Sequence, residues 1–343
     1  MAHLSLLQGT KLATKYIHSY ITNRPIVISY EVTLSCNCNC CHCDLGGVIK
    51  GEKQITPEEY GDLTQRLKPL AAQISGGEPL LRKDIAAIVR AIKQAGVRYM
   101  ILVTNGVLLN ESNYLQLREA GVNQFSVSLD FPDERHDDFR RRPGLYKRLE
   151  QTLPQLAKLG FRDIILNTAI TKANLREILP LAKKAIEWGV DISYSAYTPL
   201  RTGNEDYCLN NGEDLGILRQ AINELIILKK QGTHLVNPKL TLQDTLKFFE
   251  QGYMPNCKAG ERFLVVMPDG SRIPCSLHRT NYATREEMIE KFSRTNRCGS
   301  CYVAMRSYSE MSLWSQVKNL PRYIQEVVFH WEKFTNHSLL NTR

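Results

Sequence analysis

Cysteines crowded into one short segment constrain this chain more than any other feature of its sequence. The segment follows an apolar run at 26–32 and reads Cys36-Asn37-Cys38-Asn39-Cys40-Cys41-His42-Cys43. Cys36, Cys40 and Cys43 have the spacing C-x3-C-x2-C, and thiolates on such a loop can bind three corners of an iron–sulfur cube. The fourth iron then stays open to a small molecule. A zinc site is the alternative, since another residue of the segment would supply a fourth ligand.

The composition is that of a folded protein with a sizeable core. The chain has 343 residues, of which 43% are apolar and 23% charged. This length suits one barrel-sized domain and a smaller module. The net charge of +9 is compatible with an anionic lipid, a nucleic acid or a phosphorylated substrate, and it selects none of them.

The sequence shows neither a secretory signal nor a membrane span. Leu4 to Leu7 is too short for the apolar region of a signal peptide. No apolar run reaches the ~18 residues of a transmembrane helix. We therefore expect a cytoplasmic location, where the ten cysteines would be thiols and metal ligands rather than disulfides.

The first 24 residues predict an amphipathic helix. Tyr16, Ile17, Tyr20 and Ile21 recur at helical spacing, with Lys15 between them. Such a helix would cap one end of a barrel. Alternatively, it would lie on a membrane surface and give the protein a peripheral membrane contact.

Strand and helix patterns alternate along the next part of the chain. Strands are predicted at 26–34, 72–75, 99–103, 125–129, 164–170 and 192–197, with longer helical patterns between them. This alternation predicts right-handed βαβ units and an α/β fold, a partial (β/α)6 barrel with its functional loops after the strands. We expect three parts: the helix at 1–24, the barrel at 25–237, and a cysteine-rich module with C-terminal helices at 238–343.

Polar residues follow several of the predicted strands. In the turn Ser75-Gly76-Gly77-Glu78, the glycines let the backbone approach a ligand closely. Three further groups occupy comparable positions: Asn105 after the third strand, Ser126, Ser128 and Asp130 along the fourth, and the run Arg140-Arg141-Arg142 downstream. The fourth-strand residues share one face because they alternate. The arginines can clamp a carboxylate or phosphate, or they form a solvated basic loop.

The cysteine loop, the Gly-Gly-Glu turn and the Ser-x-Asp strand occur in the order typical of radical S-adenosylmethionine (radical SAM) enzymes, which residues 26–197 resemble. The resemblance implies that Cys36, Cys40 and Cys43 hold a 4Fe–4S cluster whose open iron chelates S-adenosylmethionine. It also implies a set of cofactor contacts: His42 at the adenine, Gly76, Gly77 and Glu78 at the methionyl amino group, Ser128 and Asp130 at the ribose or carboxylate, Arg140 at the carboxylate, and Asn105, Ser126 and Asn167 in the same pocket.

Four later cysteines form a second group: Cys257, Cys275, Cys298 and Cys301. Cys275 ends the motif Gly270-Ser-Arg-Ile-Pro-Cys275, and the last two form C-x2-C. Zinc is one possible occupant. The group also resembles the SPASM and twitch auxiliary-cluster modules of radical SAM enzymes. Because no cysteine follows Cys301, that resemblance implies a shortened module with one auxiliary 4Fe–4S cluster and four protein ligands.

The resemblance implies a radical SAM oxidoreductase or transferase with two clusters. It would reductively cleave S-adenosylmethionine, abstract a hydrogen atom from its substrate, and catalyse an oxidation, a cross-link or the formation of a new C–C or C–X bond. We expect a small-molecule or lipid substrate and a reducing donor of the flavodoxin or ferredoxin type. Candidates to face the substrate are Glu31, Tyr194, Tyr197 and Arg201, and no residue is assigned as catalytic.

Two other functions are compatible with parts of the sequence. One is a radical SAM enzyme that modifies RNA or peptides, although no nucleic-acid-binding motif accompanies the positive charge. The other is a zinc-stabilised module without catalytic activity.

Overall fold

The computed structural model describes residues 6–209, 211–232 and 234–310, and it confirms the predicted α/β partial barrel. The eight-stranded sheet has the order β6-β5-β4-β3-β2-β1-β7-β8. Each of the first six strands is parallel to its neighbours: β1 (Val27–Glu31), β2 (Ala71–Ser75), β3 (Tyr99–Thr104), β4 (Gln124–Ser128), β5 (Ile164–Ile170) and β6 (Asp191–Ala196).

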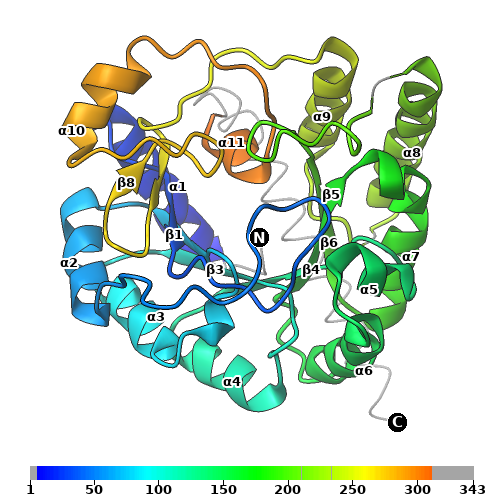
Figure 1. The fold of residues 1–343 in the computed structure, drawn as a ribbon, viewed down its shortest axis with the longest axis horizontal. Helices are drawn as coiled ribbons and strands as arrows, with labels where there is room; N and C mark the ends of the chain where they lie inside the picture. Colours follow the sequence, from blue (N-terminus) through cyan, green and yellow to red (C-terminus); the bar gives the residue numbers. More distant parts are fainter. Residues whose placement is uncertain (1–5, 210, 233, 311–343) are drawn as a thin grey trace.

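Helices surround the curved sheet on its outer side (Figure 1). They are α2 (Pro57–Leu67), α3 (Ile85–Gln94), α4 (Glu111–Ala120), α6 (Leu145–Ala157), α7 (Ile178–Trp188) and α8 (Gly212–Lys230). At the start of α2, Thr56 and Glu59 form a reciprocal capping box and Pro57 takes the first turn. Asn110 and Asn113 cap α4 in the same way.

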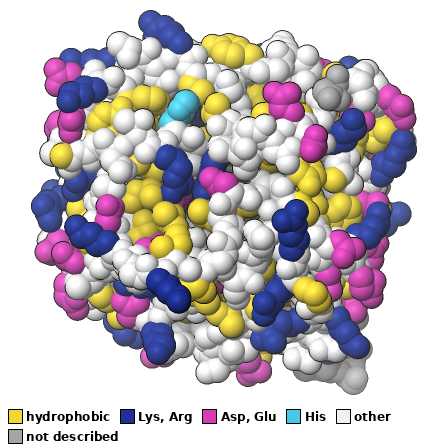
Figure 2. All heavy atoms as spheres, in the orientation of Figure 1, with side chains coloured by type: hydrophobic (Ala, Val, Ile, Leu, Met, Phe, Trp, Pro, Cys, Tyr) yellow, Lys and Arg dark blue, Asp and Glu magenta, His cyan; other side chains and the backbone are white. Residues whose placement is uncertain are grey.

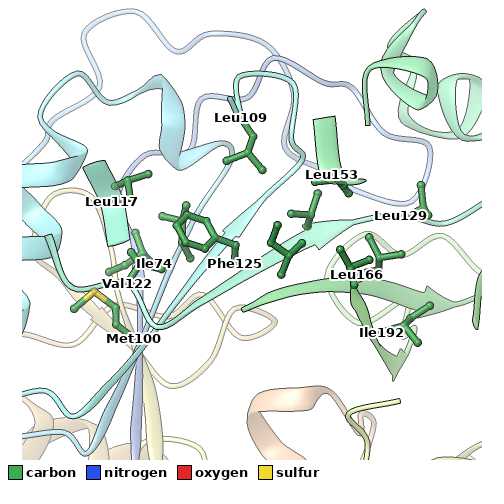
Figure 3. Close-up of a cluster of buried hydrophobic side chains, with 14 of the residues drawn as sticks. Ile74, Met100, Leu109, Leu117, Val122, Phe125, Leu129, Leu153, Leu166 and Ile192 are labelled. Atoms are coloured by element: carbon green, nitrogen blue, oxygen red, sulfur yellow. The ribbon is translucent and has the colours of Figure 1, made fainter. Parts of the chain in front are cut away.

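The apolar positions of the strands face these helices. Phe125 and Val127 of β4 are fully buried, as are Met100 and Leu102 of β3. Figure 3 shows part of this core, with labelled side chains from strands (Ile74, Met100, Phe125, Leu166 and Ile192) and from α4 and α6 (Leu117 and Leu153). Each such buried side chain contributes about 2 kcal/mol.

The alternate strand positions face the interior of the barrel. They carry mainly small or uncharged side chains: Ser29, Gln73, Ser75, Ser126, Ser128, Asn167, Ser193 and Ser195. Most of these are only half-buried, whereas the helix-facing side chains between them are buried. The inner face of the sheet is therefore polar and partly accessible.

Several of the described elements were not predicted individually from the sequence. Four of them are a short helix α5 (Arg135–Arg140), a helix α9 (Lys239–Gln251), and the strands β7 (Phe263–Val266) and β8 (Arg272–Ile273). β7 lies parallel to β1, and β8 pairs with it antiparallel. The cysteine-rich module is thus joined to the barrel through one continuous sheet. The part of the predicted module beyond Glu310 lies outside the described residues.

The helix expected near the N-terminus is α1 (Leu6–Ile21). Lys15 Nζ donates to Gly96 O at 2.8 Å, and the Arg262 guanidinium lies 3.7 Å from the centre of the Tyr20 ring. Gly96 and Arg262 both precede strands, so α1 packs against the amino-terminal end of the barrel, behind the sheet in Figure 1. None of the described helices is both long enough and apolar enough to cross a membrane.

The contact between α1 and the barrel predicts a difference between two neighbouring substitutions. Tyr20→Ala removes the ring beneath the Arg262 cation and should lower the free energy of unfolding by about 1 kcal/mol. Ile21→Ala is the control, because Ile21 is 74% exposed and its truncation should change stability by no more than about 0.5 kcal/mol. Urea unfolding of the two variants measures both values. Equal losses would show that α1 is not held through Tyr20.

Candidate functional site

The cysteine loop follows β1 and crosses the carboxyl end of the barrel, over the centre of the ring of strands in Figure 1. Cys36 and Cys40 are buried, and Cys43 is half-buried. Figure 2 shows the same face, with charged side chains of both signs spread along its rim and hydrophobic and uncharged atoms over much of its middle. The loop thus occupies the position at which parallel-barrel enzymes bind their ligands.

Nitrogen donors point at the sulfur of each predicted cluster ligand. Asn105 Nδ2 lies 3.7 Å from Cys36 Sγ, and an Arg140 guanidinium nitrogen lies 3.7 Å from Cys40 Sγ. The backbone N–H of Leu45 donates to Cys43 Sγ at 3.5 Å. Such donors stabilise thiolate sulfur and tune the potential of iron–sulfur clusters.

The structure distinguishes the two other cysteines of the loop. Cys38 is buried. Its hydrogen bonds with Cys36 and Cys40 are the main reason why the pKa of Cys36 falls to about 6 and that of Cys40 to about 7. Cys41 instead directs its thiol to Asp138 O at 3.7 Å. The Cys38 thiol therefore lies with those of Cys36 and Cys40, whereas the Cys41 thiol is directed to a backbone oxygen.

The Gly-Gly turn after β2 packs directly against the start of the cysteine loop. Gly77 N donates to Thr33 O at 2.7 Å, and Glu78 N donates to Ser35 O at 2.9 Å. A side chain on Gly76 would overlap Thr33 O, and one on Gly77 would overlap Ser35 O. Gly76 also has a φ of +135°, which L-residues with side chains rarely adopt. Both glycines are required by this contact between two backbones.

The side chain of Glu78 lies inside the protein. Its carboxylate accepts hydrogen bonds from Thr104 Oγ1 and Asn105 N, both at 2.8 Å, and from Leu80 N at 3.0 Å. Burial raises the pKa of Glu78 to about 7, although these hydrogen bonds favour the ionised form. The carboxylate thus joins the turn to the end of β3, and the predicted contact of this turn with an amino group would come from its backbone.

Asp130 and Arg140 pair with each other beneath the loop. Arg140 Nε donates to Asp130 Oδ2 at 2.6 Å, and both residues are buried. Burial is the largest single influence and favours the neutral acid, but the charges of Arg140, His42 and His136 and the hydrogen bond from Arg140 together hold the pKa of Asp130 below its usual range. Asp130 Oδ1 and His136 Nε2 are buried without a protein partner. Buried polar atoms of this kind suit a polar ligand.

His42 and the interior strand residues complete the predicted set. The His42 ring stacks on Phe139 with ring centres 4.6 Å apart, and its buried Nδ1 has no protein partner. Ser128 and Asn167 are paired across β4 and β5, so their side chains lie side by side on the inner face. Ser126 occupies the same face one step earlier. The strand residues thus share the inner face of the sheet, and His42 lies on the cysteine loop.

The candidates expected to face the substrate occupy different places. Tyr194 was wrongly predicted, since its hydroxyl donates to Ile178 O at 2.6 Å in the helix layer. Glu31 lies at the end of β1 and pairs with Arg279 at 2.9 Å. Arg201 pairs with Asp44, the residue after Cys43, at 2.6 Å.

Three elements that position the loop were not identified from the sequence. Arg82 donates to Val32 O at 3.1 Å, and the Glu52 carboxylate accepts from Thr33 Oγ1 and from the Leu34 backbone. On the other side, Phe139 O of α5 accepts from Cys41 N at 2.9 Å. Arg82, four residues after Glu78, carried no signal that separates it from an ordinary surface arginine.

The structure brings the four later cysteines together beside β7 and β8. Burial is the main cause that raises the pKa of Cys275 to about 11, and the charges of Cys257 and Cys298 add to it. Burial likewise raises the pKa of Cys301 to about 12, with Cys257 and Cys275 again contributing. Asn296 links two of the cysteine segments, since its Nδ2 donates to Cys257 O at 3.1 Å and its Oδ1 accepts from Cys298 N at 2.9 Å.

The donor sets fit iron–sulfur clusters. Thiols gather at both positions, and N–H groups point at the sulfurs of the first set and at Cys275, which accepts from His278 N at 3.3 Å. Among the described residues, no three His, Cys, Asp or Glu side chains converge on a point that would hold a single metal ion. The cysteine ligands of a cube bind different irons, so they surround a larger volume than the ligands of one ion do.

Comparison with known proteins identifies the family. Residues 30–191 match the Radical SAM superfamily. This segment belongs to the radical SAM superfamily. The 4Fe–4S cluster and S-adenosylmethionine are the cofactors of radical SAM enzymes. The matched segment contains the cysteine loop, the Gly-Gly-Glu turn and α5.

Two relatives illustrate how far the similarity extends. The chain is 37% identical to an AdoMet-dependent heme synthase of Methanosarcina barkeri over 193 residues, which are 54% of each protein. It is 25% identical to a probable GTP 3′,8-cyclase of Methanothermobacter marburgensis over 78% of this chain and 89% of that protein. The chain thus matches about half the length of the first relative and most of the second.

Two solved structures share the fold over more of this chain than the superfamily match covers. anSMEcpe with bound AdoMet and a peptide superposes with a TM-score of 0.59 at 16% identity, covering 89% of this chain and 99% of that one. Streptococcus suis SuiB bound to S-adenosylmethionine gives 0.57 at 18% identity, covering 82% and 67%. Each superposition therefore includes residues of this chain outside 30–191, the segment that matches the superfamily.

The backbone contact at Gly77 yields a prediction about metal content. Gly77→Ala places a methyl group against Ser35 O, which should displace the residues leading to Cys36 and cost about 3 kcal/mol in stability. Iron bound after anaerobic reconstitution should fall by about half if the other cluster is kept.

The matched control is Gly216→Ala, on an exposed position of α8 with open space around it. It should retain all of its iron and gain up to about 1 kcal/mol of helix stability. Full iron content in Gly77→Ala would contradict the proposed role of the turn.

Proposed function

We propose that this enzyme reductively cleaves S-adenosylmethionine at the cysteine loop and uses the resulting radical on a small polar molecule. The observation that carries the proposal is the loop itself. Cys36, Cys40 and Cys43 each receive an N–H at sulfur, and the loop is fixed by the Gly-Gly turn on one side and by α5 on the other.

Different residues would bind the cluster and S-adenosylmethionine. Cys36, Cys40 and Cys43 would ligate the 4Fe–4S cluster, and the backbone of the Gly76-Gly77 turn would face the methionyl amino group. Asp130, with one buried oxygen lacking a protein partner, and the Ser128–Asn167 pair would receive the polar groups of the nucleoside. The bound cofactors supply an electron and a 5′-deoxyadenosyl radical that removes a hydrogen atom from the substrate.

Arg140 would serve both cofactors. Its guanidinium lies between Asp130 and the sulfur of Cys40, and it is buried. A buried cation here balances negative charge on the ligand thiolates and can attract a carboxylate. An external reductant of the flavodoxin or ferredoxin type would deliver the electron.

A second 4Fe–4S cluster would occupy the group formed by Cys257, Cys275, Cys298 and Cys301. Its four protein ligands leave no iron open, which suits electron transfer rather than direct substrate binding. The β7–β8 hairpin places this group beside β1, and the Glu31–Arg279 pair links the loop that follows Cys275 to the inner face of the barrel. The net reaction would then be an oxidation or a related bond-forming step.

The inner face of the barrel favours a small polar substrate over a lipid. Its accessible side chains include Ser193, Ser195 and Gln73, and the buried Glu31 is neutralised by the half-buried Arg279. Lys15 and Tyr20 of α1 contact the barrel rather than facing away from it. The two relatives described above, a heme synthase and a probable GTP cyclase, are also named for reactions of small molecules.

Anaerobic reconstitution with iron and sulfide, followed by S-adenosylmethionine and dithionite, tests the first step. The intact protein should bind about eight irons and release 5′-deoxyadenosine. Cys36→Ala, Cys40→Ala and Cys43→Ala should each abolish its formation. Cys41→Ala is the control from the same loop and should keep it, because that thiol points to Asp138 O. Undiminished 5′-deoxyadenosine in any of the first three variants would refute the ligand assignment.

Cys38→Ala decides which thiols bind the cluster. Cys38 is hydrogen-bonded to Cys36 and Cys40. If Cys36, Cys40 and Cys43 are the ligands, the Cys38→Ala variant should still bind about four irons at the loop. If it loses them while Cys43→Ala keeps them, Cys38 is the third ligand. Cys298→Ala should leave 5′-deoxyadenosine formation intact and lower the iron content to about four.

A further inference from the structure

The largest fully buried side chain among the described residues is an arginine, Arg306. It lies on α11 (Ala304–Ser309), five residues after Cys301, and is 0% exposed. Arginine is almost never fully buried unless its charge is paired and its donors are used. Its position in the cysteine-rich module therefore needs an explanation.

Arg306 uses most of its donors on the backbone next to cysteines. One terminal nitrogen donates to Cys301 O at 2.6 Å, and the other donates to Met254 O and Pro255 O, both at 2.6 Å. Pro255 stands two residues before Cys257. One side chain thus fixes both cysteine-bearing segments.

Glu310 completes the arrangement. It accepts from Arg306 Nε at 2.8 Å through one oxygen and from Lys258 N at 2.8 Å through the other. Lys258 directly follows Cys257. The pair of side chains therefore holds the chain on both sides of Cys257 and at Cys301.

The charges of the pair also lie next to the cysteine segments. The Arg306 guanidinium donates to the carbonyl oxygen of Cys301, and the Glu310 carboxylate accepts from the N–H of Lys258, the residue after Cys257. A fixed charge that influences a ligand sulfur also influences the metal cluster bound to it, because the interior screens charges weakly.

We propose that Arg306 is the residue that positions the ligands of the auxiliary cluster and sets its reduction potential, with Glu310 as the opposing charge. This inference rests on the auxiliary cluster of the proposed function. The reduced cluster is more negative than the oxidised one, so a buried cation beside it raises the potential and a carboxylate lowers it. A higher potential makes the cluster a better acceptor of electrons.

The experiment measures the auxiliary cluster alone, in a protein that carries Cys36→Ala, Cys40→Ala and Cys43→Ala. Redox titration followed by electron paramagnetic resonance gives its potential. Arg306→Gln should shift the potential to a more negative value, and Glu310→Gln should shift it to a more positive one. Arg306→Lys keeps the charge and should shift it less than Arg306→Gln does.

A matched control separates charge from packing. Arg285 also donates to backbone carbonyls, those of Asn23 and Glu261, and neither of these hydrogen bonds involves a cysteine. Arg285→Gln should leave the potential unchanged. Shifts of the same sign in Arg306→Gln and Glu310→Gln, or no shift in Glu310→Gln, would overturn the proposal.

Loss of the cluster in Arg306→Gln would not prevent a decision, because Glu310→Gln and Arg306→Lys still report the effect of charge. The starting protein separates this proposal from the one on which it depends. If the triple cysteine variant binds no iron at all, the auxiliary cluster is wrong. If it binds about four irons and its potential ignores both side chains, only the role of Arg306 is wrong.

Discussion

The close contact between two backbone segments, the Gly76-Gly77 turn and residues 33–35, is the constraint on which the rest of the site depends. β1 and β2 are neighbours in the sheet and end at the same edge, so the chain leaving each strand must share one small space. Only residues without side chains leave room for the hydrogen bonds from Gly77 N and Glu78 N. Those bonds fix the residues immediately before Cys36, and hence the position from which the cysteine loop starts.

Much of the barrel could be predicted from the sequence because its strands and helices have strong and different periodicities. The predicted strand at 164–170 coincides with β5, and the other five differ from the observed strands by a few residues at their ends. The polar face of β4 followed from strict alternation. β7 and β8 were missed because β7 has four residues and obtains its hydrogen bonds from β1, more than two hundred residues earlier. Periodicity within a segment carries no information about such a distant partner.

The site shows the same division between local and distant information. The cysteine spacing and the Gly-Gly-Glu turn could be recognised because each is a contiguous motif. The contacts of Arg140 with Cys40 and of Arg82 with Val32 join residues that are 100 and 50 positions apart in the chain. The contiguous run of arginines did not predict them. Arg140 ends a helix and is buried, whereas Arg141 and Arg142 are exposed, so one of three identical residues takes part.

The two cysteine groups are built on a common plan. In each, an arginine from a short helix enters the interior beside a cysteine, Arg140 of α5 at Cys40 and Arg306 of α11 at Cys301. Each arginine also pairs with a carboxylate, Asp130 in one case and Glu310 in the other. A buried cation with a paired anion lowers the cost of gathering thiolates in a low-dielectric interior.

The central claim is that the cysteine loop holds a 4Fe–4S cluster with one iron open to S-adenosylmethionine. Mössbauer spectroscopy of protein reconstituted with ⁵⁷Fe, in which Cys298 and Cys301 are replaced so that only this cluster remains, tests it most directly. The account predicts that S-adenosylmethionine changes the signal of about one iron in four and leaves the others as they were. A spectrum that is the same with and without S-adenosylmethionine would contradict it.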